Sequence, residues 1–99
     1  MADHLPSIQS LRAFEASARL GGFSAASDAL GLSQSTVSYQ IGQLEEAIGT
    51  PLFIRGTRRI DLTEAGQAFL PDVVRILADL TASISRARPD DPQAIRIHV

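Results

Sequence analysis

Residues 23–48 read FSAASDALGLSQSTVSYQIGQLEEAI, and this stretch decides the fold. Its first part predicts a short helix with Ser24 as N-cap, because a serine hydroxyl can accept a free backbone N–H at a helix start. Gly31 follows that helix where a left-handed backbone favours glycine. Ser33 is expected to cap a longer helix that runs to about Ile48. A short helix, a turn containing glycine and a longer helix together predict a helix-turn-helix.

The longer helix of this motif has two different faces. Its apolar positions are spaced four, three and four residues apart, which predicts one stripe facing the core. The stripe consists of Val37, Ile41, Leu44 and Ile48. The opposite face is small, polar and uncharged, and it consists of Ser35, Ser38, Tyr39, Gly42 and Gln43. An interior glycine costs about 0.8–1 kcal/mol relative to alanine, so we expect a packing or docking reason for Gly42.

This polar face is typical of a DNA-reading helix. In a helix-turn-helix the second helix enters the major groove, where serine and glutamine can bond base edges or phosphates. Solvated side chains on an exposed helix are the alternative. Glu45 and Glu46 lie towards the C-terminal end and are expected to face solvent, where their charge would keep that end out of the groove.

A basic hairpin is predicted directly after the motif. Two short apolar runs on either side of a glycine turn predict a wing over residues 53–62. The wing holds the chain's cluster of positive charge, which consists of Arg55, Arg58 and Arg59. Such arginines can bind phosphates or enter the minor groove, whereas the alternatives are a solvated turn or ion pairs with Asp61 or Glu64. The complete set expected at DNA is Ser24, Ser33, Gln34, Ser35, Thr36, Ser38, Tyr39, Gln43, Arg55, Arg58 and Arg59.

A long amphipathic helix is expected next, capped by Thr63 and continuing to about Ala87 with Pro71 inside it. Its apolar stripe extends beyond any core that the first 62 residues can supply. We therefore expect a second copy of the chain to cover the remainder, with packing onto a further domain as the alternative. The residues assigned to dimerisation are Phe69, Val73, Ile76, Leu77, Leu80 and Ile84.

These elements predict a mostly α fold with three regions. Residues 1–62 are expected to form a winged helix-turn-helix domain, with a three-helix core and a two-stranded β wing. Its first helix is expected to be capped by Ser7. Residues 63–88 are expected to form the linker and dimerisation helix. Residues 89–99 are expected to form a hinge and the first strand of another domain.

Composition narrows the function. The formal net charge of −2 favours a protein–protein module as the alternative, since nucleic-acid binders are often strongly basic. All nine basic residues are arginine, which suits phosphate and guanine edges. Genome base composition is the alternative explanation for the absence of lysine, and it is the favoured one. Without cysteine there is neither a disulfide nor a thiolate metal site, and no apolar run approaches the roughly 20 residues that span a bilayer. No pairing of a nucleophile with a base, no glycine-rich loop for binding phosphate and no spacing typical of metal ligands is visible, so we expect a non-enzymatic protein. We also expect the protein to be cytoplasmic and to make no contact with a membrane.

Five motifs across residues 5–88 resemble the LysR-type transcriptional regulators. They are Leu11-Arg12-Ala13-Phe14; Phe23-Ser24-Ala25-Ala26 with Leu30; Ser35 through Leu44-Glu45; Gly49-Thr50-Pro51-Leu52-Phe53 with Arg55; and Leu62-Thr63-Glu64-Ala65-Gly66. The most similar branch is the one that holds the glycine-cleavage activator and the beta-lactamase regulator. Arg96-Ile97 with Val99 is similar to the opening strand of that family's effector-binding domain.

The resemblance implies a homodimer that binds a partly palindromic, double-stranded promoter site, a tetramer in the full-length protein, and RNA polymerase as a further partner. It implies contacts to bases and phosphates from Gln34, Ser35, Ser38 and Tyr39, and a wing contact from Arg55. It implies no cofactor in these residues and a small-molecule inducer on a downstream domain. Tyr39 departs from the family pattern, in which Arg or His is common there, and this puts a bidentate base contact in doubt.

Overall fold

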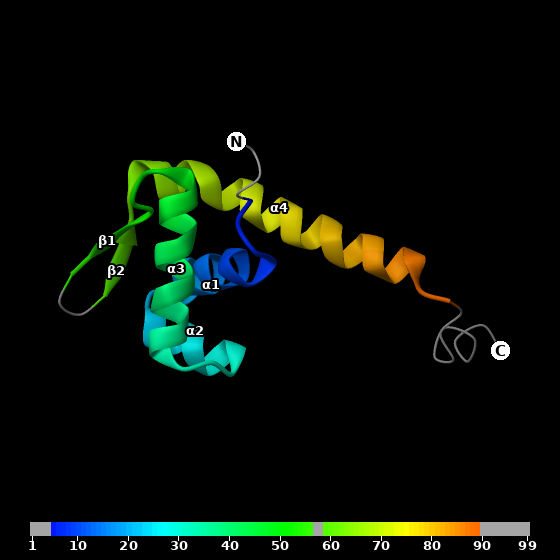
Figure 1. Cartoon of the computed structure of the whole chain (residues 1–99), viewed down its shortest axis with the longest axis horizontal. Helices are drawn as coiled ribbons and strands as arrows, with labels where there is room; N and C mark the ends of the chain where they lie inside the picture. The colour runs from blue at the N-terminus through cyan, green and yellow to red at the C-terminus, as the bar shows by residue number, and fades with distance from the viewer. Residues whose placement is uncertain (1–4, 57–58, 90–99) are drawn as a thin grey trace.

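The computed structural model describes residues 5–56 and 59–89. Within these ranges the chain forms α1, α2, α3, β1, β2 and α4, in that order (Figure 1). The expected mostly helical class with a two-stranded wing is confirmed. Arg58 and residues 90–99, which include most of the expected hinge and strand, lie outside the described residues.

α1 (Ile8–Leu20) and α2 (Phe23–Leu30) begin in different ways. The hydroxyl of Ser7 accepts the Ser10 N–H at 3.1 Å, so the predicted cap of α1 is confirmed. The prediction that Ser24 caps α2 is wrong. Gly22 is the N-cap, with an extended backbone and no side-chain cap, and Ser24 lies in the first turn. The helix starts two residues earlier than expected because Phe23 packs against the core from its first position.

α3 (Gln34–Ile48) begins as expected, since the hydroxyl of Ser33 accepts the Thr36 N–H at 3.1 Å. Of its predicted stripe, Val37, Ile41 and Leu44 are fully buried. Ile48 is 39% exposed, so its assignment to the core is wrong. It is the last helical residue, and the chain turns away directly after it through a left-handed glycine.

The wing consists of β1 (Phe53–Arg55) and β2 (Ile60–Leu62), which pair antiparallel. Arg55 lies opposite Ile60 in this register, and Phe53 lies opposite Leu62. α4 (Glu64–Ala87) follows at once. Its N-cap Thr63 accepts the Gly66 N–H at 3.0 Å, and the Thr63 hydroxyl donates to the Pro51 carbonyl at 2.8 Å. These bonds fix the start of α4 to the base of the wing.

One core joins the three N-terminal helices to the wing and to the first half of α4. Phe14 lies at its centre, with the rings of Phe53 and Phe69 at 5.4 and 5.5 Å from it. The buried apolar residues are Leu11, Ala13, Phe14, Ala16, Ala26, Val37, Ile41, Leu44, Leu52, Phe53 and Val73. The second half of α4 extends away from this core as an arm (Figure 1). No helix in the described ranges combines the length and the apolar character needed to cross a membrane.

Candidate nucleic-acid interface

The N-terminal end of α3 carries a polar surface. Gln34, Ser35 and Tyr39 are exposed, and Tyr39 is 62% exposed although it is a large aromatic residue. The Ser33 hydroxyl already forms hydrogen bonds within the subunit, because it lies 2.8 Å from the hydroxyl of Thr36 and 3.2 Å from that of Ser35. α3 contains no lysine or arginine, so basic groups beside it must come from other elements.

The wing supplies those groups in a groove that we name the wing cleft. This cleft has a volume of about 380 Å³ and lies between α2, α3 and the wing. Its lining residues are Gly22, Phe23, Ser24, Gln34, Ser38, Arg55, Gly56, Arg59 and Ile60. Five of the expected DNA-contacting residues, from three separate elements, therefore meet in one place: Ser24, Gln34, Ser38, Arg55 and Arg59.

The two described wing arginines are held differently. The Arg55 guanidinium donates to the Glu45 carboxylate at 3.1 Å and lies 5.2 Å from the centre of the Phe23 ring. Arg59 is 77% exposed in its side chain and lies 3.7 Å from the Asp61 carboxylate, so one predicted alternative partner is present. Both arginines keep N–H groups available at the cleft, because a guanidinium carries five donors.

Glu45 is the residue beside the wing cleft whose environment the sequence predicted wrongly. Its side chain is only 16% exposed, and one carboxylate oxygen accepts the N–H groups of Leu52 and Phe53 at 2.8 and 3.3 Å. The expectation that Glu45 faces solvent is therefore wrong, whereas Glu46 is exposed as expected. One feature of the sequence could have predicted this burial: Glu45 directly follows Leu44 and therefore lies at the edge of the apolar stripe of α3.

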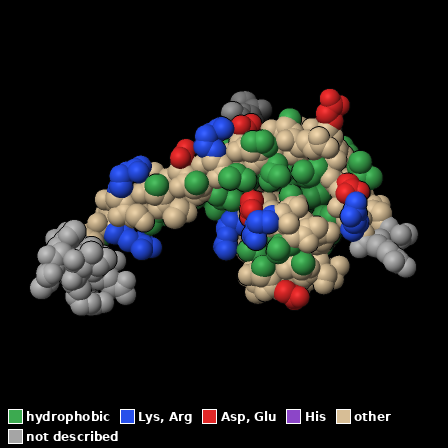
Figure 2. Space-filling view, turned by 180° about the vertical axis from the view of Figure 1, so that it is seen from behind, with side chains coloured by type: hydrophobic (Ala, Val, Ile, Leu, Met, Phe, Trp, Pro, Cys, Tyr) green, Lys and Arg blue, Asp and Glu red, His purple; other side chains and the backbone are tan. Residues whose placement is uncertain are grey.

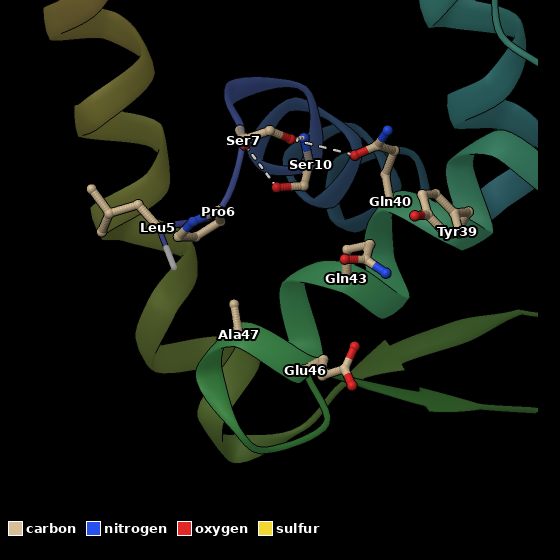
Figure 3. A pocket seen from close by; sticks show the side chains of 9 residues that line it. All are labelled: Leu5, Pro6, Ser7, Ser10, Tyr39, Gln40, Gln43, Glu46 and Ala47. Atoms are coloured by element: carbon tan, nitrogen blue, oxygen red, sulfur yellow. Dashed lines mark hydrogen bonds between the residues drawn. The ribbon is translucent and has the colours of Figure 1, made fainter. Parts of the chain in front are cut away.

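A second groove lies on the other flank of α3, and Figure 3 shows the side chains that line it. It measures about 750 Å³ and is lined by Leu5, Pro6, Ser7, Ser10, Tyr39, Gln40, Gln43, Glu46 and Ala47. The Ser7 hydroxyl donates to the Gln40 side-chain carbonyl at 3.4 Å across it. This lining holds one acid and no basic side chain, so the two flanks of α3 differ in charge. Tyr39 and Gln43 thus belong to the neutral-to-acidic flank and Ser38 to the basic one.

The apolar residues of α4 divide between the core and the surface. Val73 is fully buried within the subunit, where it belongs to the same core cluster as Phe14, so its assignment to dimerisation is wrong. Phe69 and Leu77 are half-buried against the same core. Ile76 and Ile84 are 39% and 45% exposed. Figure 2 shows apolar side chains continuing along the arm between charged ones.

A three-helix core with a helix-turn-helix and a β wing defines the class of winged helix-turn-helix domains. Residues 8–67 match the family model for bacterial regulatory helix-turn-helix proteins of the lysR family. The chain belongs to this family, as its five motifs predicted.

Relatives and solved structures agree with this assignment. The regulator BudR of Klebsiella aerogenes is 51% identical over 82% of this chain and 57% of that protein. The glycine cleavage system transcriptional activator of Escherichia coli K12 is 41% identical over 82% of this chain and 27% of that protein. The chain therefore spans only part of the length of these curated relatives.

Two similar structures were solved with DNA. The CbnR_DBD-DNA complex has a TM-score of 0.79 and 39% identity, and the match covers 83% of this chain and 94% of that one. A complex of BenM_DBD with catB site 1 DNA has a TM-score of 0.77 and 31% identity, over 81% and 89% of the two chains. At 39% and 31% identity, the chain is similar to these two proteins in sequence as well as in fold.

Proposed function

We propose that this chain binds double-stranded promoter DNA in a sequence-specific manner, as the DNA-binding part of a homodimeric transcriptional regulator. Residues 34–48 enter the major groove, and the wing lies on the backbone or in the minor groove. The wing cleft carries the proposal, because it gathers two arginines beside the uncharged polar face of a recognition helix. The two similar structures, both of them complexes with DNA, support it.

The chemistry of the cleft suits a phosphate beside exposed base edges. Arg55 and Arg59 supply charge for the phosphate, while Gln34 and Ser38 supply neutral donors and acceptors next to it. Two phosphate contacts per subunit make four in the proposed homodimer, which correspond to a slope of about −3.6 in a plot of log K against log salt concentration. Phosphate contacts then contribute a modest part of the free energy of binding, which agrees with a chain of net charge −2.

Self-association through α4 completes the proposed regulator. The arm carries exposed Ile76 and Ile84 where the subunit offers no cover. A two-fold pair places its recognition helices about 34–36 Å apart, or a multiple of this, and reads a partly palindromic site. We further propose that the chain acts in the cytoplasm without catalytic activity. The inducer, the tetramer and the contact with RNA polymerase that the resemblance implies stay predictions.

Selection of bound sequences from a random duplex pool tests this function. The affinity for the most enriched site is then measured at several salt concentrations. We expect enrichment of a two-part motif and binding that weakens steeply between about 50 and 200 mM salt. A chain that enriches no sequence and shows no salt-dependent binding would refute the proposal.

A protein–protein module is the second candidate. It is favoured by the net negative charge, by the lack of basic residues on α3 and by Glu46 in the second groove. Binding to random duplex separates the two, because release of counterions is expected only when DNA is bound.

A further inference from the structure

Glu45 connects the recognition helix to the wing. One of its carboxylate oxygens accepts the backbone N–H groups of Leu52 and Phe53, where the chain enters β1. The other oxygen accepts from Arg55 at 3.1 Å. A single side chain of α3 thus binds both the backbone that starts the wing and the wing's half-exposed arginine.

Arg55 is restrained from a second direction. Its guanidinium carbon lies 5.2 Å from the centre of the Phe23 ring, at a distance that permits a cation–π interaction. Phe23 is itself fixed, since its ring meets that of Phe53 edge-on at 5.6 Å. A long side chain that would otherwise sample many rotamers is therefore held at the wing cleft before any ligand arrives.

We propose that Glu45 is a positioning residue for DNA recognition: it holds Arg55 so that the arginine meets a phosphate only when α3 is seated in its proper register. This inference rests on the proposed function. Contacts to phosphate fix the register and orientation of a protein on the duplex, so an arginine with a preset direction favours the specific complex over loosely docked ones. Partial neutralisation by Glu45 also weakens the pull of Arg55 on unrelated DNA.

Glu45→Gln separates this role from support of the fold. The carboxamide oxygen can still accept the Leu52 N–H, whereas the amide nitrogen replaces the oxygen that faces Arg55. Glu45→Ala is unsuitable, because it would leave the N–H of buried Leu52 without an acceptor. Glu46→Gln is the matched control: it removes the same charge from the neighbouring position, where the side chain is exposed.

The experiment measures the affinity of the full chain for its selected site and for a random duplex, with thermal unfolding to verify the fold. We expect Glu45→Gln to lower the ratio of the two affinities about tenfold, mainly through the selected site. Glu46→Gln should leave the ratio unchanged. Arg55→Ala should lower the ratio by a similar factor, and adding Glu45→Gln to that variant should lower it no further.

Two results would overturn the inference: an unchanged ratio in Glu45→Gln, or a loss from Glu45→Gln that is equally large when Arg55 is already absent. In the second case Glu45 would act through the fold alone. Failure of the proposed function looks different, because the wild-type chain would then select no site at all.

Discussion

Gly66 should tolerate no side chain, because α4 meets the base of the wing at this residue. A β-carbon built there would overlap the Leu52 carbonyl oxygen and lie 2.9 Å from Cδ2 of Leu62. The carbonyl cannot move freely, since it accepts the Thr63 N–H at 3.0 Å. Gly66→Ala must therefore shift either the start of α4 or the entry to β1.

The expected cost follows from two opposing effects. Overpacking against backbone costs about 3 kcal/mol, at the upper end of the usual range. Alanine regains at most about 1 kcal/mol of helix propensity. We expect the free energy of unfolding to fall by about 2 kcal/mol, which corresponds to a melting temperature about 8–16 °C lower for a domain of this size.

Thermal unfolding followed by far-UV circular dichroism measures this shift. Gly42→Ala is the matched control, because the same substitution in the middle of α3 meets no atom within 4 Å. That variant should be stabilised by about 0.8–1 kcal/mol. Equal melting temperatures for Gly66→Ala and the wild type would refute the proposed contact between α4 and the wing. The open space at Gly42 also shows that packing within the subunit is not why glycine stands there.

The other predictions concern DNA binding and assembly. Arg59→Ala should weaken binding to all duplexes alike and reduce the salt slope by about one for each subunit, because its exposed guanidinium is expected at a phosphate; an unchanged slope in salt titrations would contradict a phosphate contact. Tyr39→Ala should lower affinity for the selected site about tenfold and change the bases enriched in a repeated selection, whereas an identical motif would remove Tyr39 from base reading. Leu80→Asp combined with Ile84→Asp should give monomers in sedimentation experiments, with Ser85→Asp as the control that stays dimeric; dimers in the double variant would exclude the arm as the interface.

Local chemistry made the starts of α1, α3 and α4 predictable. Ser7, Ser33 and Thr63 each cap a helix as expected, because a cap depends on a hydroxyl and on backbone N–H groups within three residues. Gly31 adopts the left-handed backbone for an equally local reason. Three of the four residues in the apolar stripe of α3 were also predicted correctly, since their spacing follows from helix geometry alone.

Errors arose where a residue's role depends on elements distant in the sequence. Ser24 is displaced from the cap because Phe23 packs into a core that the wing helps to form. Val73 is buried because elements distant in the sequence form the core into which it packs, and the periodicity of α4 alone does not reveal where that core ends.

The sequence by itself determined the helices, the turn between α2 and α3, and the polar residues on the outer face of α3, because each depends on neighbours within a few positions. Only the tertiary structure decided which of those residues share the wing cleft and that Glu45 holds Arg55 from ten positions away. The reason is physical: the side chain of an acid near a helix end is free to face water or to accept buried N–H groups, and only the path of the following chain brings such groups within its reach.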